Sequence, residues 1–104
     1  MRRVGSGRFT YEEVKGWGQF PGSWTASDIP AVAVDSHDHI YALSRNKGGD
    51  CVAVFTPGGH LISSWGAGLF VRPHGIFIGP DDAVFTVDDR GHSLRKLPQM
   101  AGNC

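Results

Sequence analysis

Apolar and polar residues alternate over short segments of the chain, and turn-forming residues separate these segments. Such alternation over four to eight residues is typical of half-buried β-strands. The pattern predicts eight strands, at residues 9–16, 31–35, 39–44, 51–56, 60–65, 74–78, 83–87 and 92–97. We therefore expect an all-β fold in which neighbouring strands run antiparallel.

Turn chemistry supports the boundaries between these strands. Asp35-Ser-His-Asp and Gly79-Pro-Asp-Asp are suited to hairpin loops, and Thr56-Pro-Gly-Gly places proline before residues that tolerate positive φ. The glycine-rich stretch 66–73 suits a longer crossover. It separates two similar halves of the chain.

The halves repeat each other. Residues 30–43 align with residues 73–86 at a separation of 43, and the same separation aligns 51–55 with 94–98. A second echo, at 48 residues, relates Val14-Lys-Gly-Trp-Gly to Ile62-Ser-Ser-Trp-Gly. A period of this length is typical of a four-stranded propeller blade. We expect a flexible N-terminus (1–8), two propeller repeats (9–98, with equivalent segments 30–55 and 73–98) and a C-terminal tail (99–104).

The predicted strands make an incomplete propeller, because closed propellers use about four to eight blades. The first strand has the outer-strand signature, and the last repeat stops after its third strand, so the two ends are complementary. Three copies would close a six-bladed ring with threefold symmetry, and we expect a homotrimer or, otherwise, a piece of a longer propeller.

Composition excludes several classes of function. Ten basic and ten acidic residues balance in a chain of 104 residues, so we expect neither nucleic-acid nor membrane binding. The sequence shows neither a transmembrane nor a signal segment, which predicts a soluble chain and leaves its compartment unknown. Only Cys51 and Cys104 are available for a disulfide, and two free thiols are favoured.

The second repeat resembles a known family of propellers. Phe70-Val-Arg-Pro-His-Gly-Ile-Phe-Ile, the following Asp-Asp-Ala-Val-Phe-Thr-Val-Asp-Asp, and His92-Ser-Leu-Arg-Lys-Leu resemble a blade of NHL-type six-bladed propellers. Among these the chain looks most like the lyase domain of peptidylglycine-amidating enzymes, which splits peptidyl-α-hydroxyglycine into an amidated peptide and glyoxylate. The resemblance covers about residues 9–98.

This resemblance implies two site residues. His74, in the Pro-His-Gly context, would be a zinc ligand, and Arg45, just after a second strand, would contact the substrate. The chain departs from the family at Ala31, which stands where the first repeat would need a second histidine, and no catalytic tyrosine context is found. A trimer would bring three His74 side chains together around zinc with one open position, which is a catalytic arrangement.

Other candidates have simpler explanations. His37 and His39 flank a hairpin turn, His60 opens an outer strand, and His92 occupies a position suited to structural hydrogen bonds. The equivalent positions of Trp17 and Trp65 favour packing between repeats, which leaves Trp24 as the freer ring. The pairs Asp81-Asp82 and Asp88-Asp89 fit turns, because neighbouring side chains on a strand point to opposite faces.

Two functions remain open. The favoured hypothesis is a propeller module that acts as a self-assembling scaffold or binding platform for a peptide or small molecule. The alternative is part of a zinc-dependent lyase with His74 on the metal and Arg45 on the substrate. A fold alone does not decide between them.

Overall fold

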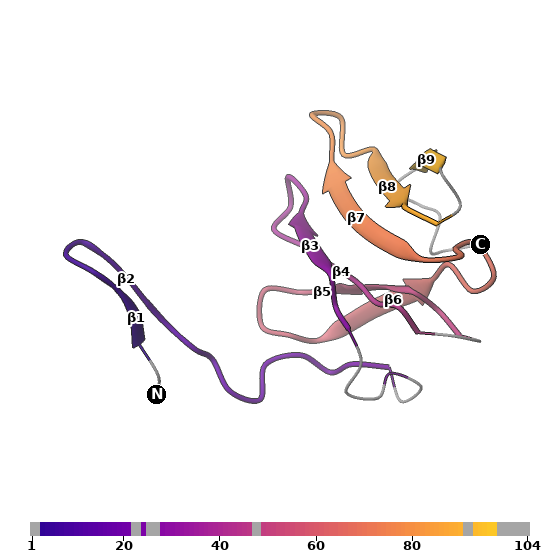
Figure 1. Ribbon diagram of the computed structural model, residues 1–104. Coiled ribbons are helices and arrows are strands. Elements are labelled where there is room, and N and C mark those ends of the chain that lie inside the picture. Colours follow the sequence, from indigo (N-terminus) through magenta and orange to yellow (C-terminus); the bar gives the residue numbers. More distant parts are fainter. Residues whose placement is uncertain (1–2, 22–23, 25–27, 47–48, 91–92, 98–104) are drawn as a thin grey trace.

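The chain is all-β. In a computed structural model that describes residues 3–21, 24, 28–46, 49–90 and 93–97, the strands form two antiparallel sheets, of four and three strands, and an N-terminal hairpin (Figure 1). This described part of the chain contains no helix, and so none long and apolar enough to cross a membrane.

Strands that follow each other in sequence are neighbours in each sheet. Sheet I has the order β3-β4-β5-β6 and sheet II the order β7-β8-β9. The strands of sheet I are β3 (Ala31–Val34), β4 (Ile40–Leu43), β5 (Val52–Phe55) and β6 (Leu61–Trp65). Those of sheet II are β7 (Pro73–Ile78), β8 (Val84–Asp88) and β9 (Ser93–Leu97), and the N-terminal hairpin joins β1 (Arg3–Ser6) to β2 (Phe9–Glu12).

From residue 31 onward, the sequence predicts every observed strand to within one residue at each end. The N-terminal region differs. β2 ends at Glu12 rather than at residue 16, because Gly16 has a φ of 76°, a value that an extended strand does not adopt. The sequence also gives no sign of β1, which pairs with β2 around Gly7 (φ 64°). This hairpin extends away from both sheets (Figure 1).

Identical turns open both sheets. The amide of Asp35 donates to the carbonyl of His39 (3.1 Å), and that of Gly79 donates to the carbonyl of Ala83 (2.9 Å). Asp38 and Asp82 both have a φ of 63°, which short polar residues tolerate. These turns correspond at a separation of 44 residues rather than the 43 of the sequence alignment.

The shift of one residue decides which faces of the two sheets are equivalent. Eight residues lie between paired Leu43 and Val52 in sheet I, but only six between Val87 and Leu94 in sheet II, so the third strands correspond at 42 residues. We call the face that carries Tyr41 and Leu43, or the equivalent Phe85 and Val87, the front face. The opposite face of each sheet is the back face.

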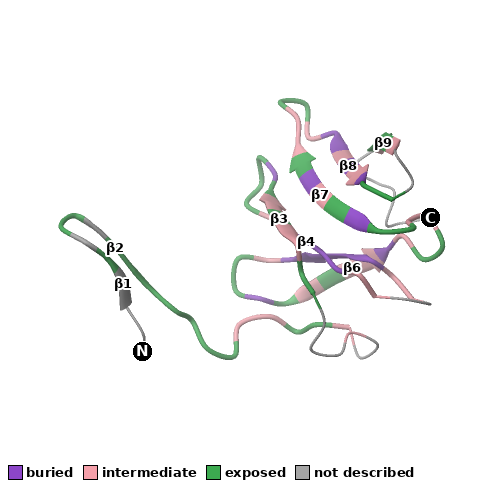
Figure 2. Cartoon of the chain, viewed as in Figure 1, coloured by how far each residue is buried: buried purple, intermediate pink, exposed green. Residues whose placement is uncertain are grey.

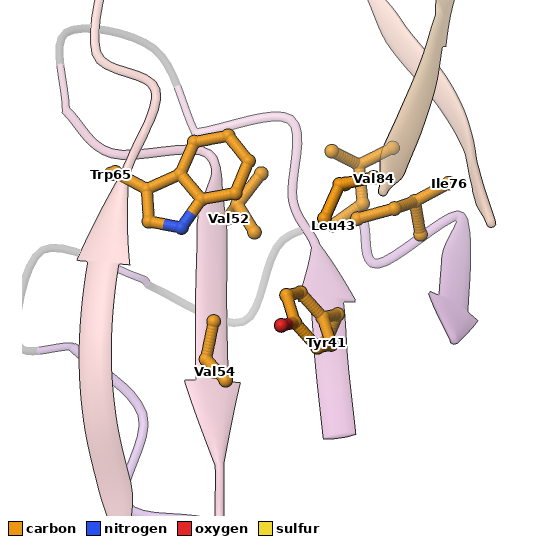
Figure 3. Packing of buried hydrophobic residues seen from close by; sticks show 7 residues of the cluster. All are labelled: Tyr41, Leu43, Val52, Val54, Trp65, Ile76 and Val84. Atoms are coloured by element: carbon orange, nitrogen blue, oxygen red, sulfur yellow. The ribbon is translucent and has the colours of Figure 1, made fainter. Parts of the chain in front are cut away.

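The front face of sheet I packs on the back face of sheet II (Figure 3). One buried cluster joins the sheets, with Ala31, Ala33, Phe70, Ile78 and Leu97 at its margin. Its members are Tyr41, Leu43, Val52, Val54 and Trp65 from sheet I and Ile76 and Val84 from sheet II. Burial of this apolar surface is the main force that holds the sheets together.

The N-terminal segment covers part of the back face of sheet I. Trp17 and Trp24 pack against Ala42, Ala53 and Phe55. The Trp17 ring lies 5.3 Å from that of Phe55, and the Trp24 indole donates to the carbonyl of Asp50 (2.8 Å). Trp24, expected to be the freer ring, is therefore fixed in the fold.

The front face of sheet II has no such cover in the described part of the chain. Figure 2 shows that β7 alternates between buried and exposed residues. The outward residue Phe77 is 49% exposed, and its ring stacks on Phe85 at 5.2 Å.

Candidate functional site

A pocket of about 770 Å³ opens where the loops of the two sheets meet. Its lining comes from the β4–β5 loop, the β6–β7 crossover and the residues that follow β8. Three arginines (Arg45, Arg72 and Arg90) and one carboxylate (Asp28) are among the lining residues. The pocket therefore carries an excess of positive charge.

Arg45 bridges the two sheets. It follows the end of β4, and its Nε donates to the carbonyl of Pro73 in β7 (3.1 Å). Its Nη1 lies 3.5 Å from the Asp28 carboxylate, and its amide donates to the Asp28 carbonyl (3.2 Å). These contacts hold the guanidinium at the junction, with its side chain only 24% exposed.

His74 lies beside Arg45, so the structure brings together the two site residues that the sequence singled out. Nη2 of Arg45 is 3.1 Å from Nδ1 of His74, and Asp89 lies 3.7 Å from the same nitrogen. A guanidinium has only donors, so Nδ1 acts as the acceptor in this contact and the neutral ring carries its proton on Nε2.

The single chain does not fit a zinc site. Zinc needs a ring nitrogen with a free lone pair and normally three or four protein ligands. In His74 the Nδ1 lone pair faces Arg45, and within the described ranges no group of three His, Cys, Asp or Glu side chains is placed to hold a metal ion. We therefore derive no chemical step through zinc.

Asp88 organises the crossover that forms one wall of the pocket. It is buried at the end of β8, and its carboxylate accepts the amides of Val71 (2.6 Å) and Arg72 (2.9 Å). Charge-assisted bonds of this kind are among the stronger ones in proteins. Asp88 therefore fixes the backbone from which Arg72 reaches the pocket.

Cys51 lies in the pocket wall as an unreactive thiol. Its side chain is buried and its Sγ donates to the carbonyl of Asn46 (3.4 Å). Burial, and then the charge of Asp50, raise the pKa of this thiol, so the nucleophilic thiolate is disfavoured. The predicted free state is confirmed for Cys51, while Cys104 lies outside the described residues.

The remaining histidines serve the turns or the surface. His39 donates its amide to buried Asp35 (2.9 Å), and its ring lies 3.1 Å from the same carboxylate. The side chain of His37 is 67% exposed, and His60 is exposed as predicted. His92 lies outside the described residues.

Sequence reasoning did not find Arg72, Arg90 or the role of Asp88. Arg72 and Arg90 are 18 positions apart, and Arg45 is further still, so no local cluster marks them. Asp88 and Asp89 were assigned to a turn as a pair. The usable signal was the crossover itself, because Arg72 directly precedes the Pro73-His74-Gly75 motif.

A scan against protein-family models finds none that matches this chain, and a search of curated proteins finds no significant match.

Proposed function

We propose that the chain is a propeller-type binding module whose pocket takes a small molecule with a carboxylate or phosphate group. The observation that carries this proposal is the set of three arginines around a pocket of about 770 Å³, opposed by a single lining carboxylate. The function remains that of a binding platform. Its ligand class follows from the charge.

Guanidinium groups suit such an anion. Each presents a planar set of N–H donors that matches two oxygens of a carboxylate or phosphate. The side chains of Phe70, Val71 and Pro73 supply an apolar wall to the same pocket. A ligand with an anionic head and a short apolar body therefore has a partner for each part.

The packing of the sheets supports a propeller-type architecture. The two sheets are equivalent in their turns and strand order, and the front of one contacts the back of the other. In a two-fold sandwich of equivalent sheets, like faces would meet. Front-to-back packing is instead the relation between successive blades of a propeller, in keeping with the NHL-type resemblance.

Binding is tested by titration calorimetry with three probes: inorganic phosphate, phenyl phosphate and hexanoate. We expect Arg72→Gln and Arg90→Gln each to weaken binding by about 10-fold or more, the loss of one charge-assisted hydrogen bond. Arg95→Gln, on exposed β9 outside the pocket, is the control and leaves affinity unchanged. Stronger binding of hexanoate than of phosphate assigns a carboxylate ligand, and the reverse order assigns a phosphate.

Two results would overturn this function. One is the absence of heat with all three probes at millimolar concentration. The other is an equal loss of affinity in the Arg95→Gln control.

The zinc-dependent lyase is the second candidate, and the contact of 3.1 Å between Arg45 and His74 is the observation in its favour. It requires that contact to break and His74 residues from several copies to share the metal. Metal analysis of the purified protein separates the two functions. We expect no bound zinc, whereas about one zinc per three chains, lost in His74→Ala, would favour the lyase.

A further inference from the structure

The contact between the two sheets shows how one unit of this fold recognises the next. Ala31 and Ala33, on the front of β3, lie against the cluster that contains Ile76 and Ile78 from the back of β7. The interface therefore joins the front of one innermost strand to the back of the next.

The same two kinds of surface are exposed at the outer ends of the pair. On the front of sheet II, Phe77 is 49% and Leu94 65% exposed. On the back of β3, Val32 is 63% and Val34 55% exposed. Exposed apolar patches on strands are costly to a soluble protein unless a partner covers them.

These exposed residues are the counterparts of residues that are packed inside. The separation of 44 residues set by the turns places Val32 and Val34 at the positions of Ile76 and Ile78. It also places Phe77 at the position of Ala33. The chain thus carries the front half of its own internal interface at one end and the back half at the other.

We propose that a second copy of this chain docks head to tail, with the front face of its sheet II on the back of β3. The internal interface is the template for this contact, and its two halves are both apolar. The inference goes beyond ligand binding and needs none of the pocket arginines. Because the contact is heterologous, repetition leads to a closed ring when the rotation permits and to an open chain otherwise.

The N-terminal segment is already arranged as this docking requires. Trp17 and Phe20 lie against Phe55 on the back of sheet I, at ring distances of 5.3 Å and 5.2 Å. In the sequence echo they correspond to Trp65 and Phe70, which lie in the internal interface. They cover the outer part of the back face and leave the β3 part exposed for the second copy.

One feature of the internal interface is missing from the proposed one. The amide and hydroxyl of Ser36 donate to the carboxylate of Asp82, which links the two turns. At the position of Ser36, sheet II has Pro80, which has neither donor. The contact between copies is therefore weaker than the internal one, and the assembly depends on concentration.

Light scattering over a range of protein concentrations tests this contact. We expect wild type to form oligomers, while Phe77→Asp and Val34→Asp each remain monomeric, with the circular dichroism of the wild-type fold. A mixture of the two variants forms dimers and no larger species, because each pair then has one intact interface. The control is Ile62→Asp, equally exposed at 51% but on β6 at the opposite edge of sheet I. It assembles like wild type.

A wild-type chain that is monomeric at every concentration would overturn the proposal. So would loss of assembly in the Ile62→Asp control, or a mixture of Phe77→Asp and Val34→Asp that remains monomeric. The pocket variant Arg90→Gln assembles normally, so failure of ligand binding and failure of assembly are separate results.

Discussion

Sheets I and II share turns and strand order, yet they differ in cover. Sheet I is packed on its whole front face by sheet II and on part of its back face by the N-terminal segment. Sheet II is packed on its back face only. The comparison teaches that the burial of a residue in this fold depends on the place of its sheet in the stack as much as on its place in the sheet.

The third strands record this difference in their composition. β5 reads Val-Ala-Val-Phe and is buried throughout, whereas β9 reads Ser-Leu-Arg-Lys-Leu and is mostly exposed. The Lys96 ammonium lies 5.9 Å above the ring of Phe85, which places charge next to the exposed apolar face. Charged residues on an edge strand oppose unspecific strand pairing.

The largest effect is expected from the same truncation in the two sheets. Phe55 is fully buried in sheet I between Trp17 and Phe20, while Phe85 stacks only on exposed Phe77. Phe55→Ala should lower the free energy of unfolding by about 3–5 kcal/mol, the usual cost of such a cavity. Phe85→Ala should cost less than about 1 kcal/mol. Urea denaturation at a concentration where the chain is monomeric measures both, and equal losses would contradict the difference in cover.

A smaller effect is expected at the two turns. Asp35 accepts the amides of His37 (2.8 Å) and His39 (2.9 Å) and the hydroxyl of buried Tyr41 (3.2 Å). Sheet II has Gly79 at this position, without a carboxylate. Asp35→Ala should therefore destabilise the protein by about 1–3 kcal/mol, because it leaves buried donors without an acceptor. Urea denaturation measures the loss.

The same carboxylate gives a pH dependence. Burial opposes ionisation of Asp35, but the amides of His39 and His37 and the His39 ring together hold its pKa below the usual range. A lowered pKa in the folded state means that the stabilisation is present above the unfolded pKa of about 4 and is lost as the pH falls below it. The melting temperature of wild type should fall below pH ~4, and that of Asp35→Asn should fall less. An identical fall in both proteins would contradict this assignment.

The smallest effect concerns the back face of sheet II. Thr86 is buried there at the position of Ala42 in sheet I, and its hydroxyl has no hydrogen-bond partner among the described residues. Thr86→Val should raise the free energy of unfolding by about 0.5–1 kcal/mol, because it removes an unpaired buried hydroxyl at nearly constant volume. Ser36→Ala, which removes a paired hydroxyl, should lower it instead. A loss of stability in Thr86→Val would show that the hydroxyl is satisfied.

The strands of both sheets were predictable because alternation and turn chemistry are local. The equivalence of the two sheets was predictable only to within one residue. Asp38 and Asp82 set it through their shared turn conformation, and the shorter loop after β8 changes it again. A single residue exchanges the two faces of a strand, so the sequence alignment did not reveal which surfaces are equivalent.

The candidate site was predictable in part. Arg45 and His74 were singled out by a motif resemblance, and the structure places them in contact. Arg72 and Arg90 were not, because their common pocket exists only when the crossover and the residues after β8 fold together. Asp88 had an unremarkable place in the sequence, and its role depends on two amides from another segment.

The sequence by itself determined the all-β class, the positions of the strands from residue 31 onward and the free thiol of Cys51. Each of these follows from local alternation, turn residues or the number of cysteines. Only the tertiary structure decided that the front of sheet I meets the back of sheet II, that three distant arginines share one pocket, and which apolar faces remain exposed. The physical reason is that packing joins residues far apart in the chain, and the identity of the neighbour decides whether an apolar side chain is buried.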